Sequence, residues 1–408
     1  MEEKDIEDPS FQYGTSRMIP SVINLIKNIL AAAMLAMPYG VAHSGLIPGV
    51  VLCFLVGGLL AYTFGILGVY CGELKVRTYR ELCEKLIGSK CGTIVDAILA
   101  LFTLPLCIGY GVFVFDCLTK VLSHAVSVEH VWYVSRAWVG FCVTILVIIP
   151  ICSISKLQSL TFTSIIGLCS IIYCYIFVVM DFANNIDESQ IAYTLSISLW
   201  GPPSGSIFGL FPIVNIYSAC FLIQYNSPQF YYELKNPTNR RFNALSFTAY
   251  GLVVLFCGSF AVLGFLRWGV GNTPGNLLLS YNAAYAVLIA TSVSLLTTYP
   301  FDFDAGRRSL MSVISQSKPE WNMRKVFWAI TLGLIPLFSV VSVLIDNLSF
   351  IVGINGSLFG MTVGVTIPGL LIYLKNRQSK FRFLGLGIGF LGITLSCLGF
   401  ATLFVNFG

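Results

Sequence analysis

The fold is decided by the stretch from Ser21 to Gly49, which reads SVINLIKNILAAAMLAMPYGVAHSGLIPG. It is long and apolar enough to enter a bilayer, since about 20 apolar residues cross the hydrocarbon core as a helix. Pro38 interrupts it, because a proline removes one helical hydrogen bond and collides with the carbonyl four residues earlier, here that of Met34. Hydrocarbon offers no partner for freed backbone groups, so protein, water or a ligand must satisfy them. The stretch therefore predicts a broken membrane helix.

The composition predicts an all-α polytopic membrane protein. Hydrophobic residues make up 56% of the 408 residues and charged residues 11%, against roughly a quarter charged in soluble domains. Apolar runs of about 20 residues recur along the chain, whereas a β-barrel would show alternating patterns of about ten residues. The acidic start, MEEKDIEDPS, and the long first apolar run argue against a cleavable signal peptide.

We predict a short cytosolic tail over residues 1–18 and a single transporter domain over 19–407. Helices 1–5 occupy about 19–181, helices 6–10 about 207–374, and helix 11 about 383–407. The eleven predicted spans are 19–45, 47–70, 93–122, 137–154, 159–181, 207–231, 243–266, 280–300, 326–345, 348–374 and 383–407. The segment 78–87 between helices 2 and 3 predicts a short amphipathic surface helix.

The basic residues predict the orientation. Of the 24 Lys and Arg residues, all except Lys120, Arg136 and Arg267 fall on the side of the N-terminal tail. By the positive-inside rule this side is cytosolic, and eleven spans then place the C-terminus on the extracellular or lumenal face. We expect a plasma membrane or a vacuole- or lysosome-type membrane.

A second helix carries the marks of a break. Its sequence is IFGLFPIVNIYSACFLIQYNSPQFYYELKNP, in which the small residues Ser218 to Cys220 precede the polar Gln224 and Asn226, and Pro228 follows. This helix lies five spans after the first, so the two cross in opposite directions, as members of an inverted repeat do. Paired interrupted helices are typical of a transporter binding site near the bilayer midplane. The alternative is a simple proline kink in each helix.

The depth of the first break suits a carboxylate. At about 1.5 Å per residue, Ala31 to Ala36 lie roughly 18–26 Å along the first helix, near or just beyond the middle of a core about 30 Å thick. Unwound N–H groups and the positive end of the adjoining helix favour a negative ligand group there.

Several stretches in this order resemble the amino acid/auxin permease family, which includes sodium-coupled, proton-coupled and vacuolar amino acid transporters. They are Asn24–Lys27 with Met37–Tyr39 and Ser44–Gly45, Tyr110–Leu118, Tyr231–Pro237 with Arg240 and Arg241, Phe350–Gly356 with Pro368–Lys375, and Thr298–Pro300 with Arg307 and Arg308. The resemblance implies the leucine-transporter type of fold, with ten helices in a five-plus-five inverted repeat and breaks in helices 1 and 6. It also implies amino acid transport by alternating access. This chain departs from it at Ala31–Ala33, where the family usually carries a glycine, and at Lys27, where sodium-coupled members carry Asn.

The candidate site residues follow from the breaks and from the resemblance. For the substrate they are Ala31, Ala32, Ala33, Leu35, Tyr110, Ser218, Cys220, Phe221, Gln224 and Ser294, and for the coupling ion Lys27, Thr297 and Thr298. Each has a structural alternative. Lys27 can snorkel to the interface, Tyr110 can simply pack, and Ser294, Thr297 and Thr298 can bond back within their own helix. Asp302 and Asp304 are interpreted as a charge cluster with Arg307 and Arg308, either salt-bridged or forming an inner gate.

The sequence thus predicts a secondary active transporter of neutral amino acids, and Lys27 favours proton coupling or sodium independence over sodium coupling. The alternative is a sensor of the same fold that binds an amino acid without significant flux. No hydrolase, phosphate-loop or zinc motif is present, so we expect no enzyme, cofactor or metal. The expected partners are an amino acid, H⁺ or Na⁺ and the lipid bilayer, with no nucleic acid, for a monomeric protein.

Overall fold

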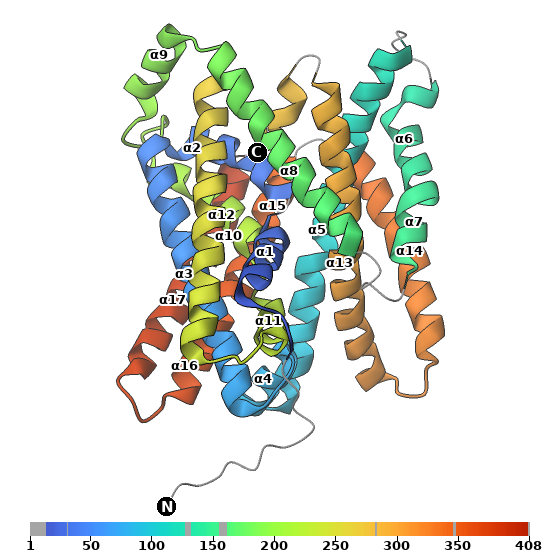
Figure 1. Cartoon of the computed structure of the whole chain (residues 1–408), viewed down its shortest axis with the longest axis vertical. Helices are drawn as coiled ribbons and strands as arrows, with labels where there is room; N and C mark the ends of the chain where they lie inside the picture. The colour runs from blue at the N-terminus through green and yellow to red at the C-terminus, as the bar shows by residue number, and fades with distance from the viewer. Residues whose placement is uncertain are drawn as a thin grey trace, which may run out of the picture.

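The computed structural model describes residues 14–30, 32–126, 132–154, 161–281, 284–345 and 348–406. These residues are almost entirely helical (Figure 1). Outside the helices they contain an isolated parallel β-bridge between Ser16 and Leu234.

The helices correspond to the predicted segments with shifted ends. The α-helices are α1 Met18–Ile29, α2 Met37–Ser44, α3 Leu46–Leu74, α4 Tyr79–Leu86, α5 Ser89–Val126, α6 Arg136–Val143, α7 Ile149–Cys152, α8 Thr161–Asn184, α9 Glu188–Ser198, α10 Phe211–Phe221, α11 Ser227–Glu233, α12 Asn239–Trp268, α13 Tyr285–Ser317, α14 Met323–Leu344, α15 Leu348–Asn355, α16 Ile367–Lys375 and α17 Phe381–Asn406. Short 3₁₀ and π turns link several of them, among them η1 Ala32–Ala36, η6 Gln224–Asn226, η8 Gly356–Gly360 and η9 Thr362–Thr366.

Among the described residues, nine helices are long and apolar enough to cross a membrane, or ten if the bent pair of α1 and the segment Met34–Ser44 is one span. The predicted span 137–154 forms the shorter apolar helix Arg136–Cys152. The count of eleven spans therefore remains a prediction. α13 continues past residue 300 to Ser317 and carries Asp302 within the helix, and the end of the eighth membrane span at residue 300 remains a prediction.

Prolines start several helices. Pro38, Pro212 and Pro228 stand in the first turns of α2, α10 and α11. A first-turn proline has no helical hydrogen bond to lose, and its fixed φ suits the start of a helix. These prolines are therefore compatible with the helix starts at which they stand and do not interrupt α2, α10 or α11.

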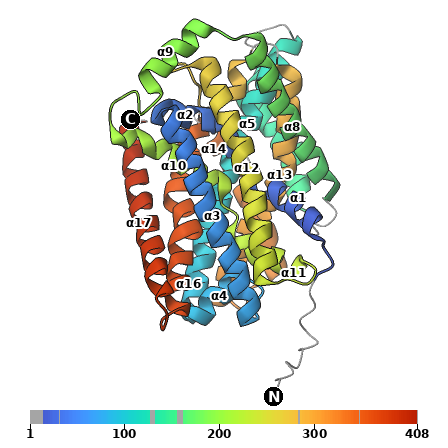
Figure 2. The ribbon, with the colours of Figure 1, turned by 60° about the vertical axis from the view of Figure 1, so that its left-hand side comes forward.

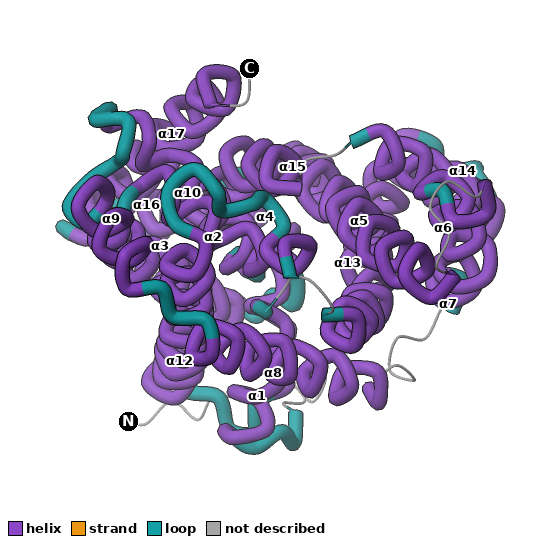
Figure 3. Tube along the Cα trace, turned by 90° about the horizontal axis from the view of Figure 1, so that it is seen from above, coloured by secondary structure: helices purple, strands orange, loops and turns teal. Residues whose placement is uncertain are grey.

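Eleven of the helices form two groups; seen from above, α2, α3, α10 and α12 of one group lie opposite α5, α6, α7, α13 and α14 of the other (Figure 3). The scaffold group consists of α5, α6, α7, α13 and α14, which pack on one another. The bundle group consists of α1, α2, α3, α10, α11 and α12, which are linked by contacts of α3 and α12 with the others. α8 packs on both α13 and α12 and so touches both groups.

The basic connections gather at one end of the molecule. The links from α3 to α5, from α13 to α14 and from α16 to α17 lie at the lower end in Figure 1, and α9 lies at the opposite end. The predicted surface helix is confirmed as α4, which buries Tyr79, Leu82 and Cys83. α9 was not predicted; the side chain of Asp187 accepts backbone hydrogen bonds from Ser189 and Gln190 at its start.

A short clasp joins the start of α1 to the end of α11, and Figure 2 shows the chain entering α1 beside α11. The clasp consists of Gly14–Ser16 and Tyr232–Lys235. The N–H of Gly14 donates to the carbonyl of Tyr232 over 2.6 Å, and the N–H of Ser16 donates to that of Glu233 over 3.1 Å. Lys235 N–H returns a bond of 2.8 Å to the Ser16 carbonyl. These bonds hold the beginning of α1 next to the end of α11.

Candidate functional site

The first break separates α1 from α2. α1 ends at Ile29, and Leu30 is extended, with a ψ of 103°. The two parts of the span are bent by 56°. The prediction that Pro38 opens the break is wrong in its detail, because Pro38 stands in the first turn of α2, inside the second part Met34–Ser44. Ala31 lies outside the described residues, and for Ala32 and Ala33 the backbone alone is described.

The second break separates α10 from α11. α10 ends at Phe221, Leu222 is extended with a ψ of 116°, and Ile223 has φ −147° and ψ 19°. The small residues from Ser218 to Cys220 lie in the last turn of the helix before the break. Both predicted interrupted helices are therefore interrupted in the structure.

Neighbouring helices of the bundle group hold the second break in shape. The Tyr250 hydroxyl on α12 donates to the carbonyl of Phe221 over 2.9 Å. Gln224 accepts from the N–H of Ile223 over 2.9 Å and donates to Leu60 O and Thr63 Oγ1 on α3, both at 3.1 Å. Buried backbone groups need such partners. Gln224, predicted to bind substrate, is thus fully buried and bonded to protein.

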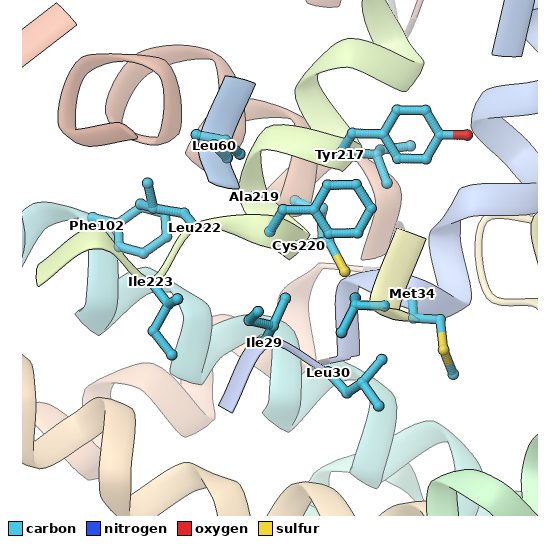
Figure 4. Close-up of a cluster of buried hydrophobic side chains, with 14 of the residues drawn as sticks. Ile29, Leu30, Met34, Leu60, Phe102, Tyr217, Ala219, Cys220, Leu222 and Ile223 are labelled. Carbon is cyan, nitrogen blue, oxygen red and sulfur yellow. The ribbon is translucent and has the colours of Figure 1, made fainter. Parts of the chain in front are cut away.

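The two breaks face each other across an apolar centre. Figure 4 shows Ile29, Leu30 and Met34 from the first broken helix next to Ala219 to Ile223 from the second. Leu35, Cys220 and Phe221 are buried as well. Ser218 is also buried, and its hydroxyl bonds to the carbonyls of Asn215 and Gly356. In this arrangement the side chains around the breaks are closely packed and mostly apolar.

A polar cluster lies beside the second break, around Asp302 of α13. The Tyr110 hydroxyl of α5 donates to Asp302 Oδ2 over 2.5 Å. The Tyr225 hydroxyl, from the turn η6 inside the break, lies 3.4 Å from Asp302 Oδ1. On the side of the first break, Lys27 Nζ lies 4.9 Å from the ring centre of Phe301. The cluster therefore joins two scaffold helices to both broken helices of the bundle group.

One face of α13 remains partly accessible at this cluster. Thr298, Phe301, Asp302 and Ala305 are half-buried, and their spacing of three and four residues places them along one side of the helix. Thr297 and Thr298 donate to the carbonyl of Ser294 over 2.7 and 2.9 Å. Helix-internal bonding of this kind is the structural alternative for the predicted ion-site threonines.

Ser294 is buried, and its hydroxyl points to α8 and not to the cluster around Asp302. Its hydroxyl donates to the carbonyl of Gly167 on α8 over 3.1 Å. Of the thirteen predicted site residues, the structure brings Tyr110, Lys27 and Thr298 to the cluster, whereas the hydroxyl of Thr297 lies beside Gly167 of α8, next to that of Ser294. It places Ser218, Gln224 and Ser294 in bonds to neighbouring protein groups.

Two residues of the cluster were not among the predicted substrate or ion ligands: Asp302, which the sequence analysis assigned to a charge cluster or inner gate, and Tyr225. Asp302 was assigned to the interface because the predicted span ended at residue 300. An acidic residue inside a membrane helix is by default a functional candidate, and that rule would have selected Asp302 had α13 been given its full length. Tyr225 carries no comparable signal, since aromatic residues are frequent in membrane helices.

The predicted salt bridging is confirmed for Asp304. Arg307 Nη2 lies 2.6 Å from Asp304 Oδ1, and Arg308 pairs with Oδ2. Arg307 is buried, donates to Cys152 O and Thr331 Oγ1 over 2.9 Å, and stacks 3.8 Å from the Phe327 ring centre. This network ties α13 to α7 and α14 inside the scaffold group.

Comparisons with known proteins agree with this architecture. The family model described as transmembrane amino acid transporter protein matches residues 14–407. Amino acid transporter AVT6E of Arabidopsis thaliana is 23% identical, with 92% of this chain and 81% of the relative covered. Putative sodium-coupled neutral amino acid transporter 11 of Rattus norvegicus is 22% identical, with 90% and 79% covered. Vacuolar amino acid transporter 5 of Schizosaccharomyces pombe is 24% identical, with 90% and 86% covered.

Solved structures show the same fold. A Na⁺-coupled sialic acid symporter in a substrate-bound outward-open state superposes with a TM-score of 0.57 at 14% identity, covering 97% of this chain and 91% of the other. Mhp1 in its inward facing conformation superposes with a TM-score of 0.55 at 10% identity, covering 97% of this chain and 94% of Mhp1. The predicted leucine-transporter type of fold is confirmed at this level, and the five-plus-five inverted repeat remains a prediction.

Proposed function

The chain belongs to the transmembrane amino acid transporter protein family, and on this premise we propose that it is a secondary active transporter of neutral amino acids that works by alternating access. The observation that carries the proposal is the pair of broken helices in the bundle group whose breaks face each other. Unwound backbone inside a membrane protein is tolerated where it is enclosed by protein or lines a cavity, and paired breaks are typical of transporter binding sites.

The substrate is proposed to bind at the backbone of the two breaks. The first break would receive the carboxylate, since the start of a helix favours negative charge. The side chains around the breaks, including Leu35, Cys220 and Phe221, are apolar or weakly polar and match a neutral amino acid better than a charged one. Among the other predicted substrate residues, Tyr110 lies at the polar cluster, whereas Ser218, Gln224 and Ser294 would first have to exchange bonds that they make to protein.

Lys27 is proposed to occupy the place of a coupling cation near Thr297 and Thr298. Its ammonium group stands over Phe301, which follows Thr297 and Thr298 by four and three residues on α13. A fixed positive charge there disfavours a bound sodium ion by Coulomb repulsion. Its position supports proton coupling or sodium independence over sodium coupling.

Alternating access is proposed to be a movement of the bundle group against the scaffold group. Gln224 and Tyr250 make their bonds within the bundle group, and Arg307 makes its bonds within the scaffold group. The hydrogen bond between Tyr225 and Asp302 crosses from one group to the other. Such an arrangement favours two rigid bodies with a polar contact between them.

We further propose that the basic end of the molecule faces the cytosol, as the positive-inside rule predicts. The protein would then lie in a plasma membrane or a vacuole- or lysosome-type membrane as a monomer, with the tail 1–18 preceding one transporter domain.

The test is transport by the purified full chain in liposomes. Uptake of each of the twenty radiolabelled amino acids is measured with no gradient, with a proton gradient and with a sodium gradient, and protein-free liposomes serve as the control. The expected result is saturable uptake of neutral amino acids that a proton gradient increases or that neither gradient affects. Saturable binding without uptake would instead identify a sensor, and the absence of both binding and uptake would refute the proposal.

A further inference from the structure

α13 carries two carboxylates, at Asp302 and Asp304, in opposite electrostatic surroundings. Asp304 is paired with two arginines, Arg307 and Arg308. Asp302 has two neutral donors, the hydroxyls of Tyr110 and Tyr225. An arginine stays charged at every physiological pH, so the partners of Asp304 are cations, whereas the partners of Asp302 are neutral hydroxyls that also tolerate an uncharged carboxyl group.

The position of Asp302 is costly for a fixed charge. Ionised side chains inside a membrane protein are expensive, and those that persist commonly mark ion pathways or proton relays. Asp302 is half-buried, so part of its surface remains accessible, whereas Asp304 is 7% exposed. The protein therefore encloses Asp302 less completely than Asp304.

The groups that face Asp302 come from three other helical segments. They are Tyr110 and Cys107 from α5, Tyr225 from η6 and Lys27 from α1, with Tyr299 one turn earlier on α13 itself. Of these, Lys27 is the cation, and Lys27 and Tyr225 belong to the broken helices of the bundle group. A change in the charge of Asp302 therefore acts directly on both broken helices.

We propose that Asp302 binds the proton that this transporter carries with its amino acid, and that proton binding weakens the contact between the scaffold and bundle groups. The inference rests on the proposed transport function and assigns its coupling group. The carboxylate takes a proton from hydronium, leaving a neutral carboxylic acid and a water molecule, and returns it to water on the other side of the membrane. No other covalent bond is made or broken.

The consequence for the helices follows from the hydrogen-bonding groups. A carboxylate accepts from both tyrosine hydroxyls at once, whereas a carboxylic acid has one oxygen that carries the proton and acts mainly as a donor. The neutral acid also loses its Coulomb attraction to Lys27. Tyr110 lies in the same group as Asp302 and can keep its bond, so the weakened contacts are those to Tyr225 and Lys27, the two residues of the bundle group.

The test compares Asp302→Asn with the wild-type chain in liposomes that contain a trapped pH-sensitive dye, using a mixture of uniformly ¹⁴C-labelled amino acids. Three quantities are measured: exchange without a gradient, accumulation driven by a proton gradient, and proton entry on addition of amino acids. Asparagine keeps the size and the acceptor oxygen but cannot be ionised. The matched control is Asp187→Asn, which replaces an exposed aspartate by another residue that caps helices well.

The wild type and the control should show all three activities. Asp302→Asn should keep exchange and lose both accumulation and proton entry to the level of protein-free liposomes. Proton entry catalysed by Asp302→Asn would overturn the inference. Loss of exchange would also overturn it if Asp302→Asn has the same unfolding temperature as the wild type, because Asp302 would then be a substrate ligand. If the wild type exchanges amino acids without moving protons, the inference about Asp302 fails while the proposed transport function stands. If the wild type shows no exchange, the proposed function fails with it.

A second variant keeps the inference testable if Asp302→Asn does not fold. Tyr225→Phe retains the ring and removes the hydroxyl that stabilises the Asp302 carboxylate. Loss of that donor favours the protonated acid, so the pH of half-maximal uptake should move to a higher value. An unchanged pH profile would overturn the inference.

Discussion

The Tyr110 hydroxyl donates to Asp302 over 2.5 Å between α5 and α13, two helices that pack closely within the scaffold group. The Tyr225 hydroxyl, which belongs to the second break in the bundle group, donates to the other oxygen of the same carboxylate over 3.4 Å. One carboxylate therefore has a shorter bond inside its own group and a longer bond to the opposite group. The two tyrosines should have separable roles.

Tyr110→Phe and Tyr225→Phe should differ in what they change. Tyr110→Phe removes a buried bond to a charged group, worth about 1.5–3 kcal/mol, and should lower the unfolding temperature of the detergent-solubilised protein. Tyr225→Phe removes a longer bond and should lower the unfolding temperature less while changing the uptake rate more. Thermal unfolding and liposome uptake of both variants check this. If both variants changed the unfolding temperature and the uptake rate by the same amounts, the assignment of Tyr110 to the scaffold group and Tyr225 to the bundle group would be contradicted.

Lys27→Gln should alter the dependence of uptake on pH or on sodium. It removes the positive charge beside α13 and keeps most of the side-chain length, which lowers the Coulomb barrier to a bound cation. Uptake is measured with and without sodium from about pH 5 to about pH 8, the range in which histidine and perturbed side chains titrate. The control is Lys318→Gln, an exposed lysine at the end of α13. An identical profile for Lys27→Gln and the wild type would support snorkelling to the interface.

Gln224→Leu should destabilise the second break. The change leaves the buried N–H of Ile223 without the acceptor that Gln224 supplies, whereas the carbonyl of Leu60 keeps the hydroxyl of Thr63 as a donor. An unsatisfied buried group costs about 1–3 kcal/mol. The expected result is a lower unfolding temperature together with reduced uptake. Uptake at the wild-type rate with unchanged stability would show that water or another residue replaces the amide.

Arg307→Met and Arg308→Met should differ although both arginines pair with Asp304. The Arg307 side chain is 1% exposed and the Arg308 side chain is 69% exposed. Removing one partner of a buried pair costs about 3–5 kcal/mol, whereas an exposed pair contributes about 0–1 kcal/mol. Thermal unfolding of the two variants measures the difference. Similar losses of stability would mean that burial does not govern this network.

Gly14→Val should open the clasp. A Cβ at Gly14 would lie 2.2 Å from the carbonyl oxygen of Glu233, a backbone atom that has little freedom to move. With the clasp open, the exposed Arg17 at the start of α1 should be cut faster by trypsin, because proteases need a locally unfolded chain. The control is Gly58→Val on α3, where an added Cβ meets nothing within 4 Å. Cleavage at the wild-type rate would show that the backbone bonds survive the substitution.

The sequence predicted the helical segments well because hydrophobic runs and basic loops follow directly from the bilayer. It also identified both broken helices, since prolines beside small residues mark the interruption. It located the break points less well. Pro38 and Pro228 lie in the first turns of new helices, and the extended residues Leu30 and Leu222 lie several positions before them.

The side-chain partners were harder to predict, because they depend on which helices meet. Gln224 looks like a substrate ligand from its position after the small residues, but α3 lies close enough to bond its amide. Asp302 was grouped with Asp304 because both precede two arginines in the sequence. Two residues along a helix differ by about 200° in direction, and this rotation turns Asp304 to the arginines and Asp302 to the tyrosines.

This opposite placement on α13 limits how the helix can evolve. Each residue advances a helix by about 100°, so inserting or deleting one residue between Pro300 and Arg307 would rotate one carboxylate away from its partners. A single substitution in this stretch disturbs the partners of one side chain, whereas a change in its length shifts Asp302 relative to Arg307 and so disturbs the tyrosine and arginine contacts together. Among homologues that share this arrangement, the spacing from the proline to the buried arginine should therefore be conserved more strictly than the residues between them.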